Sequence, residues 1–140
     1  MSLDQNTVLD DIAIARLAER VETAQTYATP IRKLTLDYPD LSLRDAYRVQ
    51  TALRHSYEAR GQRVIGWKAG LTSKPKMAQM GVETPVYGFL ADYFSVPDGG
   101  DIDTSELIHP KIEAEVAFVT KAPLKGPGCH IGDVLAATDF

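Results

Sequence analysis

The sequence has little of what a secreted, disulfide-bonded or membrane-spanning protein needs. It contains one cysteine, Cys129, in 140 residues, so an internal disulfide and a cysteine-cluster zinc site are both excluded. No apolar run approaches the roughly 18 residues that a membrane-spanning helix requires. The amino terminus, MSLDQ, lacks the basic start and the apolar core of a signal peptide. These features favour a soluble, cytoplasmic protein with no membrane segment.

Positive charge is also scarce. Fifteen Lys and Arg residues face 19 Asp and Glu residues, which gives a net charge of -4. No cluster of basic residues provides the face that a nucleic-acid-binding protein needs, so we expect no nucleic-acid partner. The chain is 44% hydrophobic and 24% charged, a balance typical of a globular protein and not of a disordered one.

Two amphipathic patterns near the amino terminus predict helices. Apolar residues recur at helical spacing over residues 7–28. A second helical pattern begins at Ser42, with Asp45 in its first turn, and stops at Gly61. We therefore expect an N-terminal helical subdomain over residues 1–62.

After residue 62 the pattern changes to short β-type segments. Three segments are expected to be strands: residues 63–70, 86–90 and 111–120. Two are expected to be short helices: residues 74–80 and 131–138. Ser73 is placed to cap the first of these helices and Gly81 to end it. The fold class is therefore α+β, with residues 63–140 forming the first part of a β-rich domain.

Glu113 and Glu115 are candidates for binding a metal ion. If residues 111–120 form a strand, both carboxylates lie on one face, about 6–7 Å apart along the strand. A hard divalent cation such as Mg²⁺ or Mn²⁺ would compensate their repulsion. Water, substrate or a further ligand would have to complete the coordination. The alternative is a solvated strand face that carries two unrelated acids.

Lys68 is a candidate catalytic residue. In the expected strand its neighbours on the same face are Gly66 and Gly70, which leave open space around the ammonium group. Trp67 and Ala69 would point the other way, into the core. Lys68 can then bind an anion or carry out acid–base chemistry. The alternative is an exposed lysine on a weak edge strand.

Thr72 and Ser73 follow in the loop after this strand. The backbone amides at the start of the short helix could hold a substrate carboxylate. The alternative is that Ser73 only caps the helix. The three histidines, His55, His109 and His130, are not spaced as metal ligands.

Four motifs together resemble the hydratase/decarboxylase family of meta-cleavage pathways, within the fumarylacetoacetate hydrolase superfamily. They are GWKAGLTS at residues 66–73, GVETP at 81–85, PKIEAE at 110–115 and AATD at 136–139. The resemblance covers nearly the whole chain and is weaker over the first 40 residues.

The resemblance implies a mixed β-sheet roll that holds the active site. It implies that Lys68 is the active-site lysine and that Glu113 and Glu115 are two of three carboxylate ligands for Mg²⁺ or Mn²⁺. Family members continue past the position of Phe140 with the third ligand, so this chain corresponds to an N-terminal part. We expect such a part to be poorly soluble or inactive by itself.

The activity implied is decarboxylation of the dicarboxylate 2-oxohex-3-enedioate to 2-hydroxypenta-2,4-dienoate and CO₂, in the degradation of aromatic compounds. The alternative is hydration of 2-hydroxypenta-2,4-dienoate. Hydratases of the family show an aspartate where this chain has Val86 in the motif PVYG. That difference favours the decarboxylase.

Partners are also implied by the resemblance. They are the vinylpyruvate hydratase that consumes the unstable dienol product and further copies of the same chain. An alternative from another class is a non-catalytic binding or assembly module that keeps the motifs without turnover.

Overall fold

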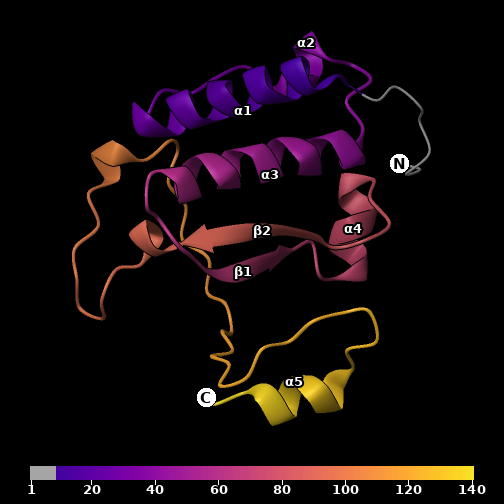
Figure 1. Cartoon of the computed structure of the whole chain (residues 1–140), viewed down its shortest axis with the longest axis vertical. Helices are drawn as coiled ribbons and strands as arrows, with labels where there is room; N and C mark the ends of the chain where they lie inside the picture. Colours follow the sequence, from indigo (N-terminus) through magenta and orange to yellow (C-terminus); the bar gives the residue numbers. More distant parts are fainter. Residues whose placement is uncertain (1–8) are drawn as a thin grey trace. The chain divides into compact units, whose positions relative to one another are not determined.

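The computed structural model describes residues 9–140 and divides into two compact units (Figure 1). One unit runs up to His109 and the other covers residues 110–140. Helices and an antiparallel sheet both occur, which confirms the α+β class. The predicted subdomain boundary after residue 62 stays a prediction.

Helix α1 (Asp11–Thr26) begins where a carboxylate caps it. The Asp10 side chain accepts a hydrogen bond from the backbone N–H of Ala13 at 2.7 Å. Residues 7 and 8 of the predicted helix lie outside the described residues. A short helix that the sequence did not predict, α2 (Leu34–Asp37), follows α1 and is joined to it by the Arg20–Asp37 ion pair at 2.5 Å.

Helix α3 (Leu43–Ala59) confirms the second predicted helix. Ser42 is its N-cap, and the Ser42 Oγ accepts from the backbone N–H of Asp45 at 3.0 Å. Buried positions spaced three and four residues apart on α1 and α3 face each other and form the core. The buried side chains of this core are Ile14, Leu17, Ala18, Leu41, Val49, Leu53 and Tyr57.

Asp45 is the one buried charged side chain among the described residues, with 1% of its surface exposed. Its carboxylate accepts hydrogen bonds from Arg48 Nη1 at 2.7 Å, Ser42 Oγ at 3.0 Å and the Leu9 backbone N–H at 3.3 Å. Arg48 also donates to the Leu9 carbonyl at 2.6 Å and to Asp11 at 2.7 Å. The first turn of α3 is therefore tied to the segment that enters α1.

Two strands form an antiparallel sheet, β1 (Val64–Gly70) and β2 (Val86–Ala91). Helix α3 lies between α1 and this sheet (Figure 1). Phe89 of β2 packs edge-on against the Tyr57 ring of α3, with ring centroids 5.8 Å apart. Both predicted strands are confirmed within a residue of their expected bounds.

Helix α4 (Lys74–Met80) connects the two strands and is confirmed with its predicted bounds. Gly81 ends it in the left-handed conformation, with φ at 66°. This conformation suits glycine because it has no Cβ. The 3-10 turns η1 (Asp92–Phe94) and η2 (Thr104–Glu106) complete the first unit.

The prediction of a strand over residues 111–120 is wrong. In the second unit only Thr120 pairs, through an isolated bridge to Thr138. A strand needs a backbone partner along its whole length. From this segment and its continuation, Val119 and Lys121 form backbone hydrogen bonds with residues 137–140. Helix α5 (Ile131–Ala137) confirms the last predicted helix.

Over residues 9–140, no helix has the length and apolar character that crossing a membrane requires.

We predict that Asp45→Asn lowers the free energy of unfolding by about 2 kcal/mol at pH 7, because charge-assisted hydrogen bonds of a buried group are lost. Burial raises the pKa of Asp45, but the hydrogen bonds from Arg48, Leu9 and Ser42 outweigh burial and hold it below 3.8. The stabilisation is therefore present above that value and is lost as the pH falls through the lower folded-state pKa. Urea denaturation at pH 7 and pH 3 should show the difference between variant and parent shrinking. The exposed Asp40→Asn is the control, and a difference that is equal at both pH values contradicts the argument.

Candidate functional site

Lys68 lies in the middle of β1 and is exposed. Gly66 and Gly70 precede and follow it by two residues, as the sequence predicted. The register adds a third glycine, because Lys68 pairs with Gly88 of β2. Gly88 was not predicted as a neighbour of Lys68, although it lies in the PVYG motif at the start of the strand that pairs with β1. Three of the positions nearest to Lys68 in the sheet thus carry no side chain.

Space around these glycines differs from one to the next. A Cβ at Gly66 would lie 3.8 Å from Leu90 Cδ1, which is an ordinary contact. A Cβ at Gly70 would lie 3.3 Å from Val86 Cγ2, which is tighter than normal. The sheet around Lys68 is therefore most crowded at the Gly70 end.

The expectation that Trp67 points into the core is wrong. Trp67 is 55% exposed, and its ring contacts Tyr87 edge-on with centroids 5.7 Å apart. Tyr87 in turn stacks on Tyr47 of α3 at 4.5 Å. Phe89 is the half-buried aromatic residue of the sheet that packs against the core. Trp67 instead lies at the exposed end of the row of rings formed by Tyr47, Tyr87 and Trp67.

Thr72 and Ser73 lie in the turn between β1 and α4, and both are exposed. The turn passes through Leu71, which has a positive φ of 56°. Ser73 Oγ accepts from the backbone N–H of Lys76 at 3.4 Å, so Ser73 does cap α4. A role of either residue in substrate binding stays a prediction.

Glu113 and Glu115 lie in the second unit, in an exposed segment with no strand. The common strand face that the sequence predicted is therefore not present. Carboxylate oxygens are the donors that a hard divalent cation prefers, so the two residues fit such a cation in their chemistry. Across residues 9–140, no three His, Cys, Asp or Glu side chains gather as a metal-binding group. The role of Glu113 and Glu115 as metal ligands therefore stays a prediction.

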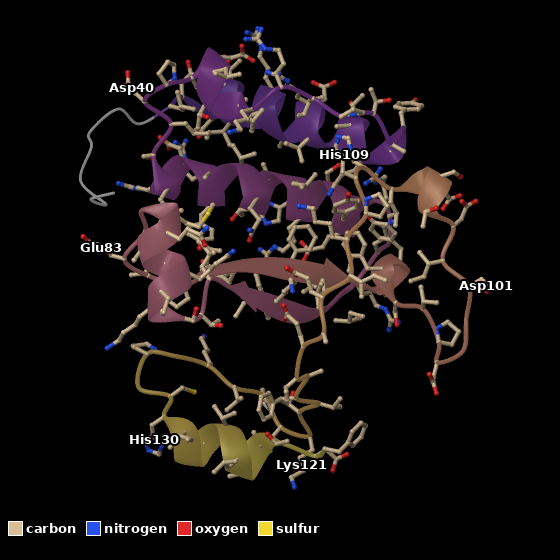
Figure 2. All side chains as sticks on the ribbon, turned by 180° about the vertical axis from the view of Figure 1, so that it is seen from behind. Asp40, Glu83, Asp101, His109, Lys121 and His130 are labelled. Carbon is tan, nitrogen blue, oxygen red and sulfur yellow. The ribbon has the colours of Figure 1, made fainter. Side chains whose placement is uncertain are left out.

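In the described part of the chain, none of the histidines belongs to a cluster of potential metal ligands. Figure 2 shows His130 at the start of α5, where its backbone N–H donates to Asp133 at 2.9 Å. Asp133 is also 3.3 Å from the His130 ring nitrogen. His130 is therefore part of a helix cap.

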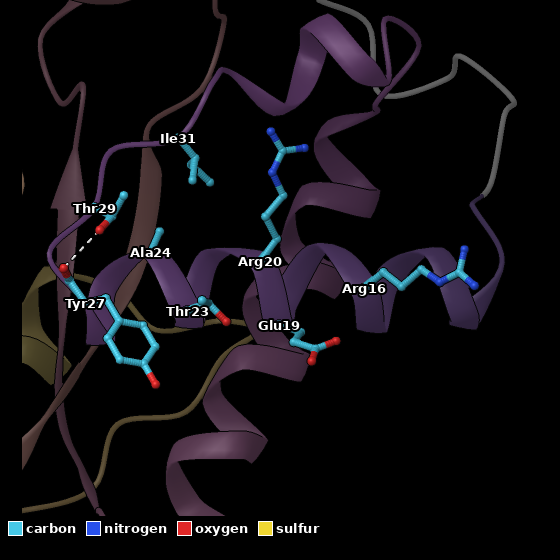
Figure 3. A pocket seen from close by; sticks show the side chains of 8 residues that line it. All are labelled: Arg16, Glu19, Arg20, Thr23, Ala24, Tyr27, Thr29 and Ile31. Atoms are coloured by element: carbon cyan, nitrogen blue, oxygen red, sulfur yellow. Dashed lines mark hydrogen bonds between the residues drawn. The ribbon is translucent and has the colours of Figure 1, made fainter.

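Two hollows in the first unit contain none of the predicted site residues. One has a volume of about 640 Å³ and lies along α1. Figure 3 shows the residues that line it: Arg16, Glu19, Arg20, Thr23, Ala24, Tyr27, Thr29 and Ile31. Thr29 Oγ1 donates to the Tyr27 carbonyl at 3.0 Å. No sequence motif marks this hollow.

The second hollow, of about 550 Å³, is lined by residues that include Tyr57 and Tyr93. The Tyr93 hydroxyl donates to that of Tyr57 at 3.1 Å, and Tyr57 donates to Gln25 at 2.7 Å. Burial and the bond to Tyr57 raise the pKa of Tyr93 well above its usual value. The Tyr93 phenol therefore stays neutral, and the hydroxyls of Tyr93 and Tyr57 act as hydrogen-bonding groups of the packing.

The chain is similar to enzymes of one family. No model of a known protein family matches it. It is 64% identical over 135 residues to the 4-oxalocrotonate decarboxylase of Pseudomonas sp. (strain CF600). The aligned region covers 96% of this chain and 51% of that protein. It is 42% identical over 124 residues to the 2-oxo-hept-4-ene-1,7-dioate hydratase of Escherichia coli. This second aligned region covers 89% of this chain and 46% of that protein.

A solved structure matches as well. It is the 4-oxalocrotonate decarboxylase from Pseudomonas putida G7 complexed with magnesium and adipate, with a TM-score of 0.90 and 60% identity. The match covers 96% of this chain and 51% of that chain. This chain thus spans about half the length of the relatives that it matches.

We predict that Ser73→Ala weakens α4 by about 1 kcal/mol, because the short helix loses its capping oxygen. Native-state hydrogen exchange at the Lys76 amide, the group that Ser73 accepts from, should become about fivefold faster. Ser73→Asn keeps a capping side chain and is expected to behave like the parent. Equal exchange in the two variants would show that the cap is not what holds this turn.

Proposed function

Because the chain belongs to the hydratase/decarboxylase family, we propose that it contributes Lys68, Glu113 and Glu115 to the active site of a divalent-metal-dependent decarboxylase. The observation that carries the proposal is the 64% identity over 96% of the chain to a decarboxylase. The three glycines around Lys68 support it, since they leave room for a ligand to approach the ammonium group.

The proposed substrate is 2-oxohex-3-enedioate. The Pseudomonas putida G7 enzyme binds adipate, a six-carbon chain with a carboxylate at each end. The proposed substrate has the same carbon count and the same two carboxylates, with a 2-oxo group and a double bond added. A site that accepts the first dianion has the length and the charge to accept the second.

The reaction is the loss of the carboxylate remote from the 2-oxo group. The double bond connects that carboxylate to the ketone as a vinylogous β-keto acid. When the carbon–carbon bond to CO₂ breaks, its electron pair moves through the alkene onto the C2 oxygen. Protonation of that oxygen gives 2-hydroxypenta-2,4-dienoate, and CO₂ leaves.

Glu113 and Glu115 would hold the divalent cation, Mg²⁺ or Mn²⁺, together with water, substrate or a further ligand. When bound, the cation supplies a Lewis acid that stabilises negative charge on the C2 oxygen. The negative charges of Glu113 and Glu115 repel the dianionic substrate, and a protonated Lys68 would offset part of that repulsion. Lys68 either moves a proton during tautomerisation or holds negative charge electrostatically.

Thr72 and Ser73 are proposed to bind a substrate carboxylate through the backbone amides of their turn. In this proposal Ser73 Oγ still accepts the capping bond from the Lys76 N–H. The backbone N–H groups of Thr72 and Ser73 donate to the substrate carboxylate. The side-chain oxygen and the backbone amides of this turn can therefore serve different roles.

A second candidate is hydration of 2-hydroxypenta-2,4-dienoate or a related dienol. The 42% identity to a hydratase favours it. Val86 argues against hydration, since hydratases of the family are expected to carry an acid at that position. We further propose cytoplasmic assembly as a homo-oligomer together with a hydratase that consumes the dienol, a pairing consistent with the relatives of both kinds.

We predict metal-dependent CO₂ release in a hybrid enzyme. The hybrid has this chain in place of the matching half of the CF600 decarboxylase, because the chain spans about half of that protein. With Mg²⁺ it should release CO₂ from 2-oxohex-3-enedioate, lose the activity on addition of a chelator and regain it with fresh Mg²⁺. The chain alone should be inactive. A folded hybrid that hydrates 2-hydroxypenta-2,4-dienoate and releases no CO₂ would establish the second candidate.

Substitutions in the same hybrid separate the proposed roles. Lys68→Ala is expected to lower kcat by about 10²–10⁴-fold, the range for a proton-transferring or charge-holding group. Glu113→Gln and Glu115→Gln are expected to raise the Mg²⁺ concentration needed for half activity, because each removes a charged oxygen ligand. Lys74→Ala, at an exposed lysine of α4, is the matched control. Unchanged kcat in Lys68→Ala rules out the proposed role of that lysine.

A further inference from the structure

Two side chains of α3 bind the backbone of one residue in β2. The Tyr87 carbonyl accepts a hydrogen bond from Gln50 Nε2 at 2.9 Å. The Tyr87 backbone N–H donates to the Tyr47 hydroxyl at 3.3 Å. Both backbone groups of Tyr87 are therefore bonded to the helix, and the ring of Tyr87 stacks on the ring of Tyr47 with centroids 4.5 Å apart. We call Tyr47 and Gln50 the α3 clamp.

The α3 clamp acts at a defined place in the ladder. In an antiparallel pair, successive residues turn their backbone groups alternately toward and away from the partner strand. Tyr87 turns its groups toward α3, so the next residue, Gly88, turns its groups toward β1. Gly88 is the register partner of Lys68, and Tyr87 is the partner of Ala69. The clamp thus fixes β2 one residue away from the point opposite Lys68.

The sheet needs such a fixed point. It has two strands in the described chain, and an isolated two-stranded hairpin is marginally stable in water. The register also shifts between Val64 and Gly66, so the pairing is irregular on one side of Lys68. Lys68 pairs with Gly88, so the register of the two strands sets where the Lys68 backbone lies in the sheet.

We propose that Tyr47 and Gln50 are positioning residues for Lys68. By holding Tyr87, they keep β2 in the register that presents Lys68 at the centre of the three glycines. The catalytic part of this inference rests on the proposed function, since it takes Lys68 as the reactive group. The positioning part concerns the sheet alone and can be measured without turnover.

The first test follows the backbone and the Lys68 amine in the folded hybrid enzyme. Amide hydrogen exchange reports on Gly88, and reductive ¹³C-methylation with NMR reports on Lys68, whose signal is assigned from its loss in Lys68→Arg. In the double variant Tyr47→Phe and Gln50→Leu, exchange at Gly88 is expected to rise about tenfold. The ¹³C chemical shift of the methylated Lys68 amine is expected to change, because its surroundings change.

Single variants identify the interaction responsible. Gln50→Glu keeps the length of the side chain but removes the donor, so it should behave like Gln50→Leu. Tyr47→Phe keeps the ring stack and loses only the hydroxyl, so its effect should be the smaller one. Tyr57→Phe is the matched control: it removes another hydroxyl of α3, one that bonds Gln25 and Tyr93 instead of β2.

The outcomes separate this proposal from the proposed function. Unchanged Gly88 exchange together with an unchanged Lys68 ¹³C signal in the double variant overturns the positioning role, as does an equal change in Tyr57→Phe. CO₂ release in the hybrid enzyme adds the kinetic readout, where the double variant should lower kcat about tenfold with KM changed less than twofold. A Lys68 signal that moves while Lys68→Ala keeps full activity upholds the clamp and removes the proposed role of Lys68.

Discussion

The first unit depends on the buried interaction between Asp45 and Arg48. A buried carboxylate is costly unless its oxygens are bonded, and Asp45 meets this condition with Arg48, Ser42 and the amide of Leu9. Because Arg48 also reaches Leu9 and Asp11, the same group joins the starts of α1 and α3. Breaking such a pair leaves an uncompensated buried charge, so the two helices are held in one arrangement.

Helix α3 connects this helix pair to the sheet. One face of the helix carries Val49, Leu53 and Tyr57 into the core with α1. Other residues of the same helix, Tyr47 and Gln50, bond the backbone of β2. The position of Lys68 therefore depends on a chain of contacts that starts at the helix pair. Glu113 and Glu115 belong to the second unit, which has its own backbone bonds between residues 119–121 and 137–140.

Local chemistry made much of the fold predictable from the sequence. Ser42 and Ser73 cap the helices that follow them, and Gly81 ends α4, because each effect involves residues only a few positions apart. The segment 111–120 shows the limit of that reasoning. Its alternation is typical of a strand, but a strand forms only where another segment supplies a ladder, and that information is not local. The bond from Leu9 to Asp45 and the bonds of Tyr87 to Tyr47 and Gln50 were missed for the same reason, since the bonded residues lie 36 to 40 positions apart. The assignments of Lys68, Thr72, Ser73, Glu113 and Glu115 came from motifs and stay predictions.

The glycines around Lys68 have a consequence for engineering the protein. None of Gly66, Gly70 and Gly88 has the positive φ that would bar another residue. A methyl group fits at Gly66 and at Gly88, where the nearest atoms would be 3.8 and 3.9 Å away, whereas at Gly70 Val86 would have to yield. Gly66 and Gly88 are therefore positions next to Lys68 in the sheet at which alanine can be introduced while the backbone is kept. A designer who wants to alter which molecules reach Lys68 would begin there, and would change Gly70 only together with Val86.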